Sequence, residues 1–210
     1  MMRFLRATLC GLALAAVAAP LAAQSSEGPW LIRVRALSLT PADKSDAIGS
    51  LSVPADAITV SSKVFPEFDI SYFFSANIAA ELVLTYPQSH DVELSGTAIG
   101  SFKQLPPTLL LQYHFLPAGT VRPYIGAGVN LTLLSDVMLT VPGVGDLDLE
   151  DSSIGWAAQV GADVQLSPGF FLNLDAKKAM IRSDVLLGSS TVSAVEVDPW
   201  LLSVGIGRRF

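Results

Sequence analysis

Residues 122–133, R-P-Y-I-G-A-G-V-N-L-T-L, alternate between two kinds of side chain. From Pro123 onward every second residue is apolar or small, and the positions between hold Arg122, Tyr124, two glycines, Asn130 and Thr132. A period of two residues is the periodicity of a β-strand. The run of 12 residues exceeds the usual length of a soluble strand, about 5–6 residues. It suits a tilted strand that crosses a bilayer, which needs roughly 9–11 residues.

Seven further stretches alternate in the same way, so the sequence predicts eight strands. The others are expected at residues 30–39, 65–74, 78–86, 108–115, 154–166, 170–181 and 197–210. Very short connections (75–77, 116–120, 167–169) alternate with long ones (40–62, 87–104, 136–153 and the stretch after 181), which we interpret as loops. An even strand number with alternating short turns and long loops is typical of outer-membrane barrels. The predicted fold class is all-β, an eight-stranded antiparallel transmembrane β-barrel of the outer-membrane type.

The composition of the two strand faces distinguishes this barrel from a soluble one. A soluble lipocalin-like barrel also has eight strands, but its apolar face points inward. Here one face is almost uniformly apolar, as at Phe68 and Ile70, and the other mixes charges, amides and glycines, as at Glu67 and Asp69. If the apolar band meets lipid, the polar set lines the lumen, and every strand edge must be paired by closure because the bilayer core holds no water.

The chain begins with the layout of a secretory signal peptide. Arg3 and Arg6 precede an apolar run over residues 9–23, which ends in Leu-Ala-Ala before Gln24. We expect cleavage near Ala23, which divides the chain into a signal peptide, 1–23, and a barrel, 24–210. An N-terminal membrane anchor is the alternative, but such a span usually needs about 20 apolar residues. Cys10 is the only cysteine and lies inside this segment, so cysteine usage does not constrain the redox compartment.

The composition agrees with a membrane protein and excludes one class of partner. Half of the residues are hydrophobic and the mean hydropathy is +0.49, which is high for a soluble protein. Without Arg3 and Arg6, 11 basic residues remain against 19 acidic ones, a formal net charge of −8. An acidic chain without a basic patch argues against a nucleic-acid partner.

Several segments resemble one family of small outer-membrane proteins. They are Leu105-Pro106-Pro107-Thr108, residues 122–130, Asp151-Ser152 with Gly155-Trp156, Gln159-Val160-Gly161, Val197-Asp198-Pro199-Trp200 and the C-terminal Arg209-Phe210. Through them the chain is similar to the OmpW family over essentially the whole mature part. It departs from the family's pattern at Arg208, where an aromatic residue is usual, and at Lys177-Lys178, where aromatic residues are common.

The resemblance implies a barrel in the outer membrane of a Gram-negative cell. The implied function is a narrow, partly hydrophobic channel for small apolar molecules. The implied partners are outer-membrane lipid, lipopolysaccharide and the barrel-assembly machinery, which would recognise the C-terminal strand through Phe210.

The strand directions place each inward residue along the barrel axis. They predict that the lumen differs in polarity between its periplasmic and outer ends. Toward the periplasm we expect a polar floor, formed by Arg33, Arg35, Asp69, Glu81, Gln112, His114, Arg122, Tyr124, Asp163, Asn173, Asp175 and Arg209. Toward the exterior we expect an apolar vestibule, formed by Leu37, Leu39, Val83, Leu110, Ala157, Ile181 and Leu201. An eight-stranded barrel is only just wide enough for its side chains, so the charges should pair across the lumen as a plug, since unpaired buried charges are costly.

Three interpretations of this lumen remain open. In the first, an apolar solute enters the vestibule, meets the charged floor and escapes sideways between strands into the bilayer. In the second, the lumen is only a packed core. In the third, the barrel is a closed structural protein whose extracellular loops bind host, phage, colicin or lipopolysaccharide.

The remaining motifs predict neither an enzyme nor a bound cofactor or metal. An EF-hand loop that began at Asp146 would need glycine at 151 and glutamate at 157, where the chain has Asp151 and Ala157; we expect a solvated acidic loop there. His90 is expected in a loop and His114 in the lumen, without a Gly-x-Ser-x-Gly elbow. Two further glycines, Gly126 and Gly128, lack the third glycine of a dinucleotide site and are interpreted as inward positions that leave room for larger lumenal side chains.

Overall fold

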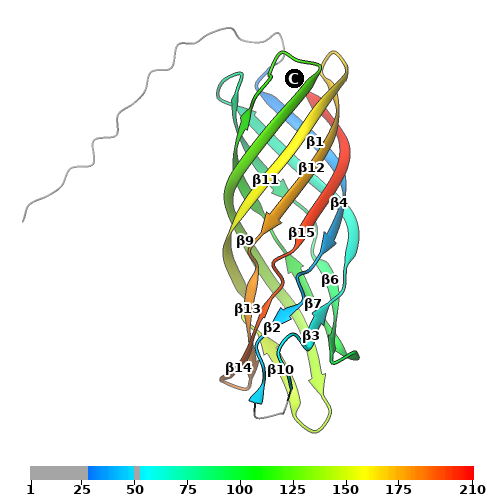
Figure 1. Cartoon of the computed structure of the whole chain (residues 1–210), viewed down its shortest axis with the longest axis vertical. Helices are drawn as coiled ribbons and strands as arrows, with labels where there is room; N and C mark the ends of the chain where they lie inside the picture. The colour runs from blue at the N-terminus through cyan, green and yellow to red at the C-terminus, as the bar shows by residue number, and fades with distance from the viewer. Residues whose placement is uncertain (1–27, 50–52) are drawn as a thin grey trace, which may run out of the picture.

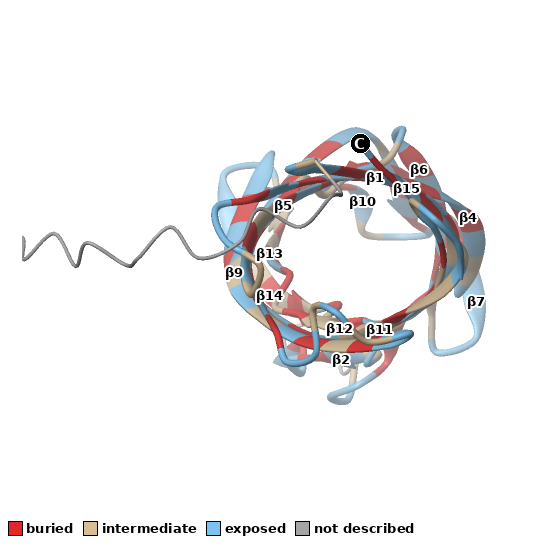
Figure 2. Ribbon diagram, turned by 90° about the horizontal axis from the view of Figure 1, so that it is seen from above, coloured by how far each residue is buried: buried red, intermediate tan, exposed pale blue. Residues whose placement is uncertain are grey.

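The computed structural model describes residues 28–49 and 53–210, and within them eight antiparallel strands close into a barrel (Figure 1). The barrel strands are β1 (Trp30–Thr40), β4 (Lys63–Phe73), β5 (Ile78–Leu84), β8 (Thr108–His114), β9 (Val121–Val141), β11 (Ser152–Ser167), β12 (Phe170–Ala179) and β15 (Trp200–Arg209). They pair in the order β11-β12-β15-β1-β4-β5-β8-β9, and the pairing of β9 with β11 closes the ring seen in Figure 2. The predicted fold class is confirmed. The predicted signal peptide, 1–23, lies outside the described residues.

The two ends of the described chain complete the barrel together. β1 pairs with β15 from Leu31 opposite Arg209 to Thr40 opposite Trp200. The backbone N–H groups of Trp30 and Phe210 each donate to the other residue's carbonyl oxygen, at 3.1 and 2.9 Å. Both ends therefore lie at the end of the barrel that also carries the short connections 74–77, 115–120 and 168–169, which we call the turn end; the opposite end is the hairpin end.

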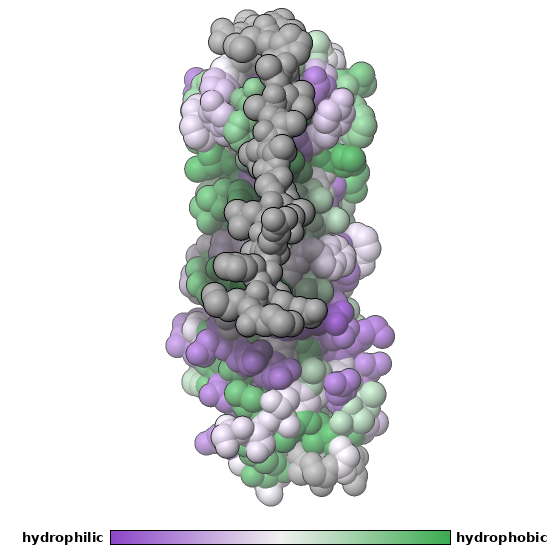
Figure 3. All heavy atoms as spheres, turned by 90° about the vertical axis from the view of Figure 1, so that its left-hand side faces the viewer, coloured by the Kyte–Doolittle hydropathy of each residue, from purple (hydrophilic) through white to green (hydrophobic). Residues whose placement is uncertain are grey.

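The alternating sequence places apolar side chains outside and the others inside. On β1, Ile32 and Val34 are exposed, whereas Arg33 and Arg35 between them are buried. Figure 3 shows the outward apolar residues as a green band, with a hydrophilic belt on its hairpin side. Aromatic residues border the band: Trp30, Tyr72, Phe74, Tyr113 and Phe115 on the turn side, and Tyr86, Trp156 and Trp200 on the hairpin side. An apolar band between aromatic girdles is the outer surface of a transmembrane barrel.

The long connections are not loops, and this part of the prediction is wrong. They contain the strands β2 (Lys44–Ser45), β3 (Ile58–Val60), β6 (Gln88–Leu94), β7 (Thr97–Leu105), β10 (Gly145–Leu149), β13 (Arg182–Leu187) and β14 (Ser190–Glu196). Glycines and charged residues interrupt the alternation of apolar and polar side chains in several of these strands, which are stabilised by pairing with one another. Several strand limits also differ. The largest difference is that β9 continues to Val141 instead of ending at residue 133; β15 begins at Trp200 instead of residue 197, and β12 ends at Ala179 instead of residue 181.

These shorter strands form a second ring at the hairpin end, which we call the outer ring. It consists of β2, β3, β6, β7, the distal half of β9, β10, β13 and β14. On one side, neighbouring strands pair in the order β3-β6-β7-β9. On the other side, they pair in the order β9-β10-β13-β14-β2. The backbone N–H of Asp56, just before β3, donates to the carbonyl of Ser45 on β2 at 2.9 Å. The outer ring thus extends the tube beyond the apolar band. No helix among the described residues is long and apolar enough to cross a bilayer.

Candidate functional site

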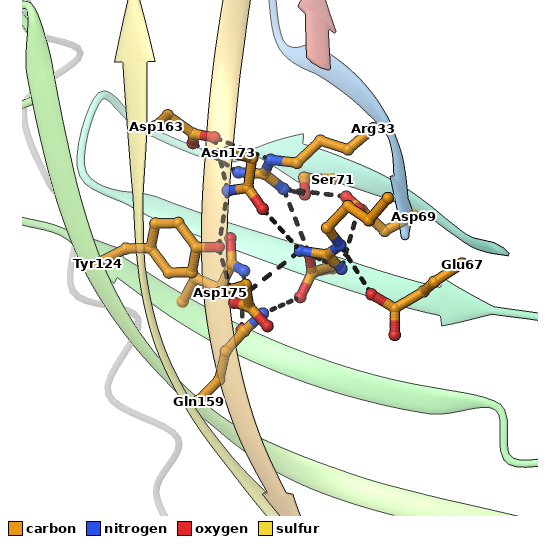
Figure 4. A network of polar contacts seen from close by, with 12 residues as sticks. Arg33, Glu67, Asp69, Ser71, Tyr124, Gln159, Asp163, Asn173 and Asp175 are labelled. Carbon is orange, nitrogen blue, oxygen red and sulfur yellow. Dashed lines mark hydrogen bonds and ion pairs between the residues drawn. The ribbon is translucent and has the colours of Figure 1, made fainter. Parts of the chain in front are cut away.

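Charged side chains from several barrel strands meet inside the lumen (Figure 4). Arg33 on β1 donates two hydrogen bonds to Asp163 on β11, from Nε to Oδ1 at 3.0 Å and from Nη2 to Oδ2 at 2.6 Å. Its Nη1 lies 2.9 Å from Oδ1 of Asp69 on β4 and 3.2 Å from Oε1 of Glu81 on β5. One buried guanidinium therefore joins four strands that lie on different sides of the lumen.

Arg35, two residues along β1, makes a second set of ion pairs. Its Nε lies 2.7 Å from Oε1 of Glu67, and its Nη2 lies 3.0 Å from Oδ2 of Asp69 and 3.3 Å from Oε1 of Glu81. Its Nη1 donates to Oδ1 of Asn173 on β12 at 3.2 Å. Asp69 and Glu81 thus each contact both arginines.

Lys177 on β12 adds the third cation of this network. Its Nζ lies 3.0 Å from Oε1 of Glu67 and 2.7 Å from Oδ1 of Asp175. The Tyr124 hydroxyl donates to Oδ2 of Asp175 at 2.8 Å and accepts from Nδ2 of Asn173 at 2.9 Å. We call the ionic part of the network the charged layer; it consists of Arg33, Arg35, Glu67, Asp69, Glu81, Asp163, Asp175 and Lys177. An eight-stranded barrel has room for little beyond its side chains, so this layer occupies the cross-section.

All of the residues predicted as a polar floor lie buried on the inner face: Arg33, Arg35, Asp69, Glu81, Gln112, His114, Arg122, Tyr124, Asp163, Asn173, Asp175 and Arg209. The structure brings most of them into one network. Arg122 and Arg209 lie at the turn end, where the Arg122 guanidinium is 4.7 Å from the ring centroid of Phe171 and that of Arg209 is 3.8 Å from that of Phe73. These cation–π contacts close the turn end of the lumen with large side chains.

The predicted floor omitted several residues that belong to the network. Glu67 and Lys177 supply ion pairs, and Gln159 donates to Oε2 of Glu81 at 2.8 Å and accepts from Gln112 at 2.9 Å. The alternation of β4, β11 and β12 places all three omitted residues on the inward face, so this signal could have identified them.

Gly126 and Gly128 were both predicted to leave space for lumenal side chains. The structure places different groups beside the two glycines. A Cβ atom at Gly126 would lie 2.8 Å from Oε1 of Gln159, a lumenal side chain, as expected. A Cβ at Gly128 would lie 1.9 Å from the backbone oxygen of Leu109. The space beside Gly128 is therefore taken by the neighbouring strand β8, and the predicted reason for this glycine is wrong.

Apolar side chains replace the charges toward the hairpin end. The residues predicted as an apolar vestibule, Leu37, Leu39, Val83, Leu110, Ala157, Ile181 and Leu201, all pack inside the tube beyond the charged layer. They follow inward polar residues along the chain toward the hairpin end, as Leu37 follows Arg35 and Val83 follows Glu81. The apolar cluster continues without interruption into the outer ring, where Phe102, Leu134 and Val195 belong to it.

Two adjoining cavities lie in this apolar part of the described tube. The outer cavity, about 30 Å³ in volume, is lined by apolar side chains of the outer ring, including Phe102, Leu134 and Val185. The inner cavity, about 20 Å³ in volume, lies between the charged layer and the outer ring. Ile181 lines both cavities, and the Glu67–Lys177 ion pair borders the inner one.

The inner cavity reaches the wall of the barrel at a seam between β4 and β5. The pairing of these strands ends at Phe68 opposite Leu84, although β4 continues back to Lys63. Beyond that point Pro66 offers no N–H, and the Thr85 hydroxyl donates to the Pro66 carbonyl at 3.2 Å. Besides its buried lining, the inner cavity is lined by Leu84, Thr85 and Pro106, which lie in this part of the wall.

Polar residues also occur among the apolar ones of the outer half, at positions that were not predicted to face the lumen. His90, predicted in a loop, is a buried residue of β6, with Nδ1 3.0 Å from the carbonyl oxygen of Ser61 and Nε2 3.0 Å from Nε2 of Gln104. Burial lowers the pKa of His90 below its ordinary value, because desolvation disfavours the charged ring. Gln88 is buried beside Gln104 on the paired strands β6 and β7. The interruption of alternation in this stretch concealed their inward orientation.

The acidic stretch after residue 145 does not form a loop either. Asp146 and Asp148 lie on β10 and are exposed to solvent, and Asp146 accepts a hydrogen bond from Thr140 at 2.7 Å. Within residues 28–49 and 53–210, no three histidine, cysteine, aspartate or glutamate side chains are grouped so that they could hold a metal ion.

The closed barrel, its outward apolar band and its ion-paired lumen define a small outer-membrane β-barrel protein. The family model described as the OmpW family matches residues 26–210, so the chain belongs to the OmpW family. The protein therefore lies in the outer membrane of a Gram-negative cell, where lipid and lipopolysaccharide surround its apolar band. In such barrels the short turns face the periplasm, so the turn end is periplasmic and the hairpin end is extracellular.

Individual relatives support the same assignment. The chain is 39% identical to "Uncharacterized outer-membrane protein y4mB" of Sinorhizobium fredii, over 96% of this chain and 91% of the relative. It is 35% identical to "Outer membrane protein W" of Vibrio cholerae, over 98% of this chain and 100% of the relative. Among solved structures, the outer membrane protein OprG from Pseudomonas aeruginosa matches with a TM-score of 0.76 and 28% identity, over 88% of this chain and 97% of that one.

Proposed function

We propose that this barrel takes up small apolar molecules from the exterior and releases them sideways into the outer membrane. The observation that carries the proposal is the arrangement of the lumen: adjoining apolar cavities lie above a charged layer, and the lower cavity reaches the barrel wall. An apolar solute gains free energy from leaving water for an apolar cavity, about 25 cal/mol per Å² of buried surface.

The charged layer gives the route its direction. An apolar molecule in the inner cavity would have to separate buried ion pairs, such as Glu67 with Lys177, in order to continue toward the periplasm. Removing a partner from a buried ion pair is strongly unfavourable, by about 3–5 kcal/mol. Movement into lipid requires no such separation, so the solute leaves through the wall.

The seam between β4 and β5 is the proposed exit. Between the Phe68–Leu84 pair and the backbone hydrogen bond from Ser61 to Asp91, the wall is held by side-chain contacts. The Thr85 hydroxyl donates to the Pro66 carbonyl, and the Lys63 Nζ donates to the Ser89 carbonyl at 2.7 Å. A wall without a continuous ladder of backbone hydrogen bonds opens at a lower free-energy cost than a paired one.

The printed name of one relative agrees with an apolar solute. "Dibenzothiophene metabolism operon protein PahQ" of Pseudomonas aeruginosa is 29% identical to this chain, over 89% of this chain and 90% of the relative. Dibenzothiophene is an apolar aromatic compound, and we propose compounds of this polarity as the solutes here.

The binding step is tested with naphthalene and the refolded barrel. Leu201→Asp places a charge at the inner cavity and should raise the Kd for naphthalene, measured by equilibrium dialysis, by about tenfold or more. Thr97→Asp, at the exposed tip of a hairpin, is the matched control and should leave the Kd unchanged. Both variants must show the mobility difference between boiled and unboiled samples that marks a folded barrel. A wild-type barrel that binds no naphthalene would favour the alternative, a closed structural barrel whose outer ring contacts host, phage, colicin or lipopolysaccharide.

The exit step is tested by closing the seam. A Pro66→Cys and Thr85→Cys double variant, linked by a short reducible thiol cross-linker, should deliver naphthalene to the lipid of vesicles more slowly and recover after reduction. The control is Val34→Cys with Ile206→Cys, an outward pair within the continuous β1–β15 ladder; its cross-link should have no effect. Equal delivery through open and cross-linked seams would rule out this exit.

We further propose that Phe210 is part of the signal for the barrel-assembly machinery. It ends the strand that closes the barrel against β1, and its side chain is exposed. Phe210→Ala should reduce the amount of folded barrel in the outer membrane of cells, while refolding of the purified chain in detergent stays the same.

A further inference from the structure

A groove runs across the lipid-facing wall of the barrel, over the outward sides of β11, β12, β15, β1 and β4. The first three of these strands face the viewer in Figure 1. The groove has a volume of about 740 Å³, and binding sites for small molecules typically have about 300–1,000 Å³. It is therefore large enough to hold part of a lipid molecule. We call it the wall groove; its lining includes Ala36, Ser38, Val64, Ala176, Leu202 and Val204.

The wall groove forms because small side chains occupy neighbouring outward positions. The strand registers place one lining residue of each strand in a row around the wall: Val160, Ala176, Leu202, Ser38 and Val64. The adjoining row toward the turn end contains two further alanines, Ala162 and Ala36. An acyl chain in this hollow contacts apolar atoms on several sides, and many such contacts together give appreciable dispersion energy.

A lysine stands at the border of the wall groove on the side of the hairpin end. Lys178 follows Ala176 by two residues on β12 and is paired with Trp200 on β15. Its Nζ lies 5.4 Å from the centroid of the Trp200 ring and donates to the carbonyl oxygen of Asp198. A charge on the lipid-facing side of a barrel destabilises it least at the level of the lipid headgroups, where the aromatic girdles also lie. Lys178 therefore marks the headgroup level.

The charge of Lys178 is not neutralised by the acidic side chains near it. Glu196 and Asp198 both pair with Arg182, at 3.1 and 3.2 Å. Among the described residues, no carboxylate forms an ion pair with Lys178, whose printed contacts are a carbonyl oxygen and an aromatic ring. An ammonium group has three donors, so Lys178 keeps donors for an anionic headgroup.

We propose that the wall groove and Lys178 form a binding site for one molecule of lipid A, the phosphorylated glycolipid part of lipopolysaccharide. One acyl chain lies in the wall groove, and a phosphate group accepts a hydrogen bond from the Lys178 ammonium. The hairpin end is extracellular, so Lys178 meets the headgroups of the outer leaflet, where lipopolysaccharide lies. The inference is independent of the uptake function, because the wall groove faces lipid and the two cavities face the lumen.

The phosphate contact is tested with the refolded full-length barrel in detergent. Native mass spectrometry measures the Kd of the first bound molecule of diphosphoryl lipid A and of dephosphorylated lipid A, which has the same acyl chains. Lys178→Gln should raise the Kd for the diphosphoryl form by about tenfold and leave that for the dephosphorylated form unchanged. Arg208→Gln is the matched control, since Arg208 is an outward cation 5.2 Å from the ring centroid of Phe170 at the turn end. It should keep the Kd of the wild type.

The acyl-chain contact is tested by filling the wall groove. Ala176→Phe adds an outward ring there and should raise the Kd for both forms of lipid A by about tenfold. Ala80→Phe, on β5 outside the wall groove, is the control and should leave both Kd values unchanged. All four variants must show the mobility difference between boiled and unboiled samples that marks a folded barrel.

Three results would overturn the proposal. Equal binding of the diphosphoryl and dephosphorylated forms by the wild type would show that no phosphate is recognised. Equal effects of Lys178→Gln and Arg208→Gln would assign the preference to the overall charge of the barrel. Equally tight binding of phosphatidylglycerol, a phospholipid, would show that the groove holds any anionic lipid. None of these results bears on naphthalene binding, so the uptake function is judged separately.

Discussion

The two halves of this lumen share the long strand β9 but are otherwise built from different strands, and they are stabilised in different ways. In the membrane half, Arg33 and Arg35 hold carboxylates from several strands at 2.6–3.3 Å. In the extracellular half, residues such as Phe102 and Leu139 pack around a cavity without ion pairs of this kind. The contrast separates two tasks: the ion pairs link strands across the lumen, and under the proposed function the apolar half receives the solute.

The largest expected effect comes from removing a central cation. Arg33→Met leaves Asp163, Asp69 and Glu81 without one of their buried partners. The free energy of unfolding, measured by urea titration of the barrel in lipid vesicles, should fall by about 3–5 kcal/mol. Arg182→Met removes ion pairs in which the arginine side chain is half exposed. It should lower the free energy of unfolding by less than about 1 kcal/mol. Equal losses in the two variants would show that the charged layer has no special role in stability.

A smaller effect is expected from the apolar half. Leu139 is buried beside the outer cavity. Leu139→Ala should lower the free energy of unfolding by about 2–3 kcal/mol. This is at the low end for such substitutions, because the surroundings of Leu139 already contain free space. We expect this loss to appear as faster proteolysis of the outer ring, while the unboiled membrane barrel keeps its mobility on a detergent gel. If Leu139→Ala unfolds the whole barrel cooperatively, the two halves are not separate units of stability.

The smallest expected effect is a dependence on pH that belongs to the outer ring. Burial lowers the pKa of His90 in the folded protein below its ordinary value of 6.5. Between that value and the lower folded pKa, the unfolded state binds a proton that the folded state does not, so stability falls as the pH decreases from about 7. Resistance of the outer ring to protease should therefore decrease on acidification, and His90→Gln should flatten this slope. An unchanged slope in His90→Gln would assign the pH dependence to other groups.

Much of the membrane barrel was predictable because its strands face two contrasting environments. Lipid on one side and a polar lumen on the other impose a strict alternation, so even the inward position of Arg33 or Leu110 follows from counting along a strand. The outer ring lies beyond the lipid, and its outer surface meets water. Residues such as Ser89 and Asp91 flank His90 without an apolar contrast, and the alternation that would have identified a strand is weak.

The sequence by itself determined the fold class, the eight membrane strands and the side of the wall on which each of their residues lies, because the period of a strand is local. The tertiary structure alone decided which residues meet across the lumen. Lys177 reaches Glu67 across 110 positions of sequence, and Gln88 meets Gln104 only because two predicted loop segments pair as strands. Such contacts depend on register and closure, which are properties of the whole ring.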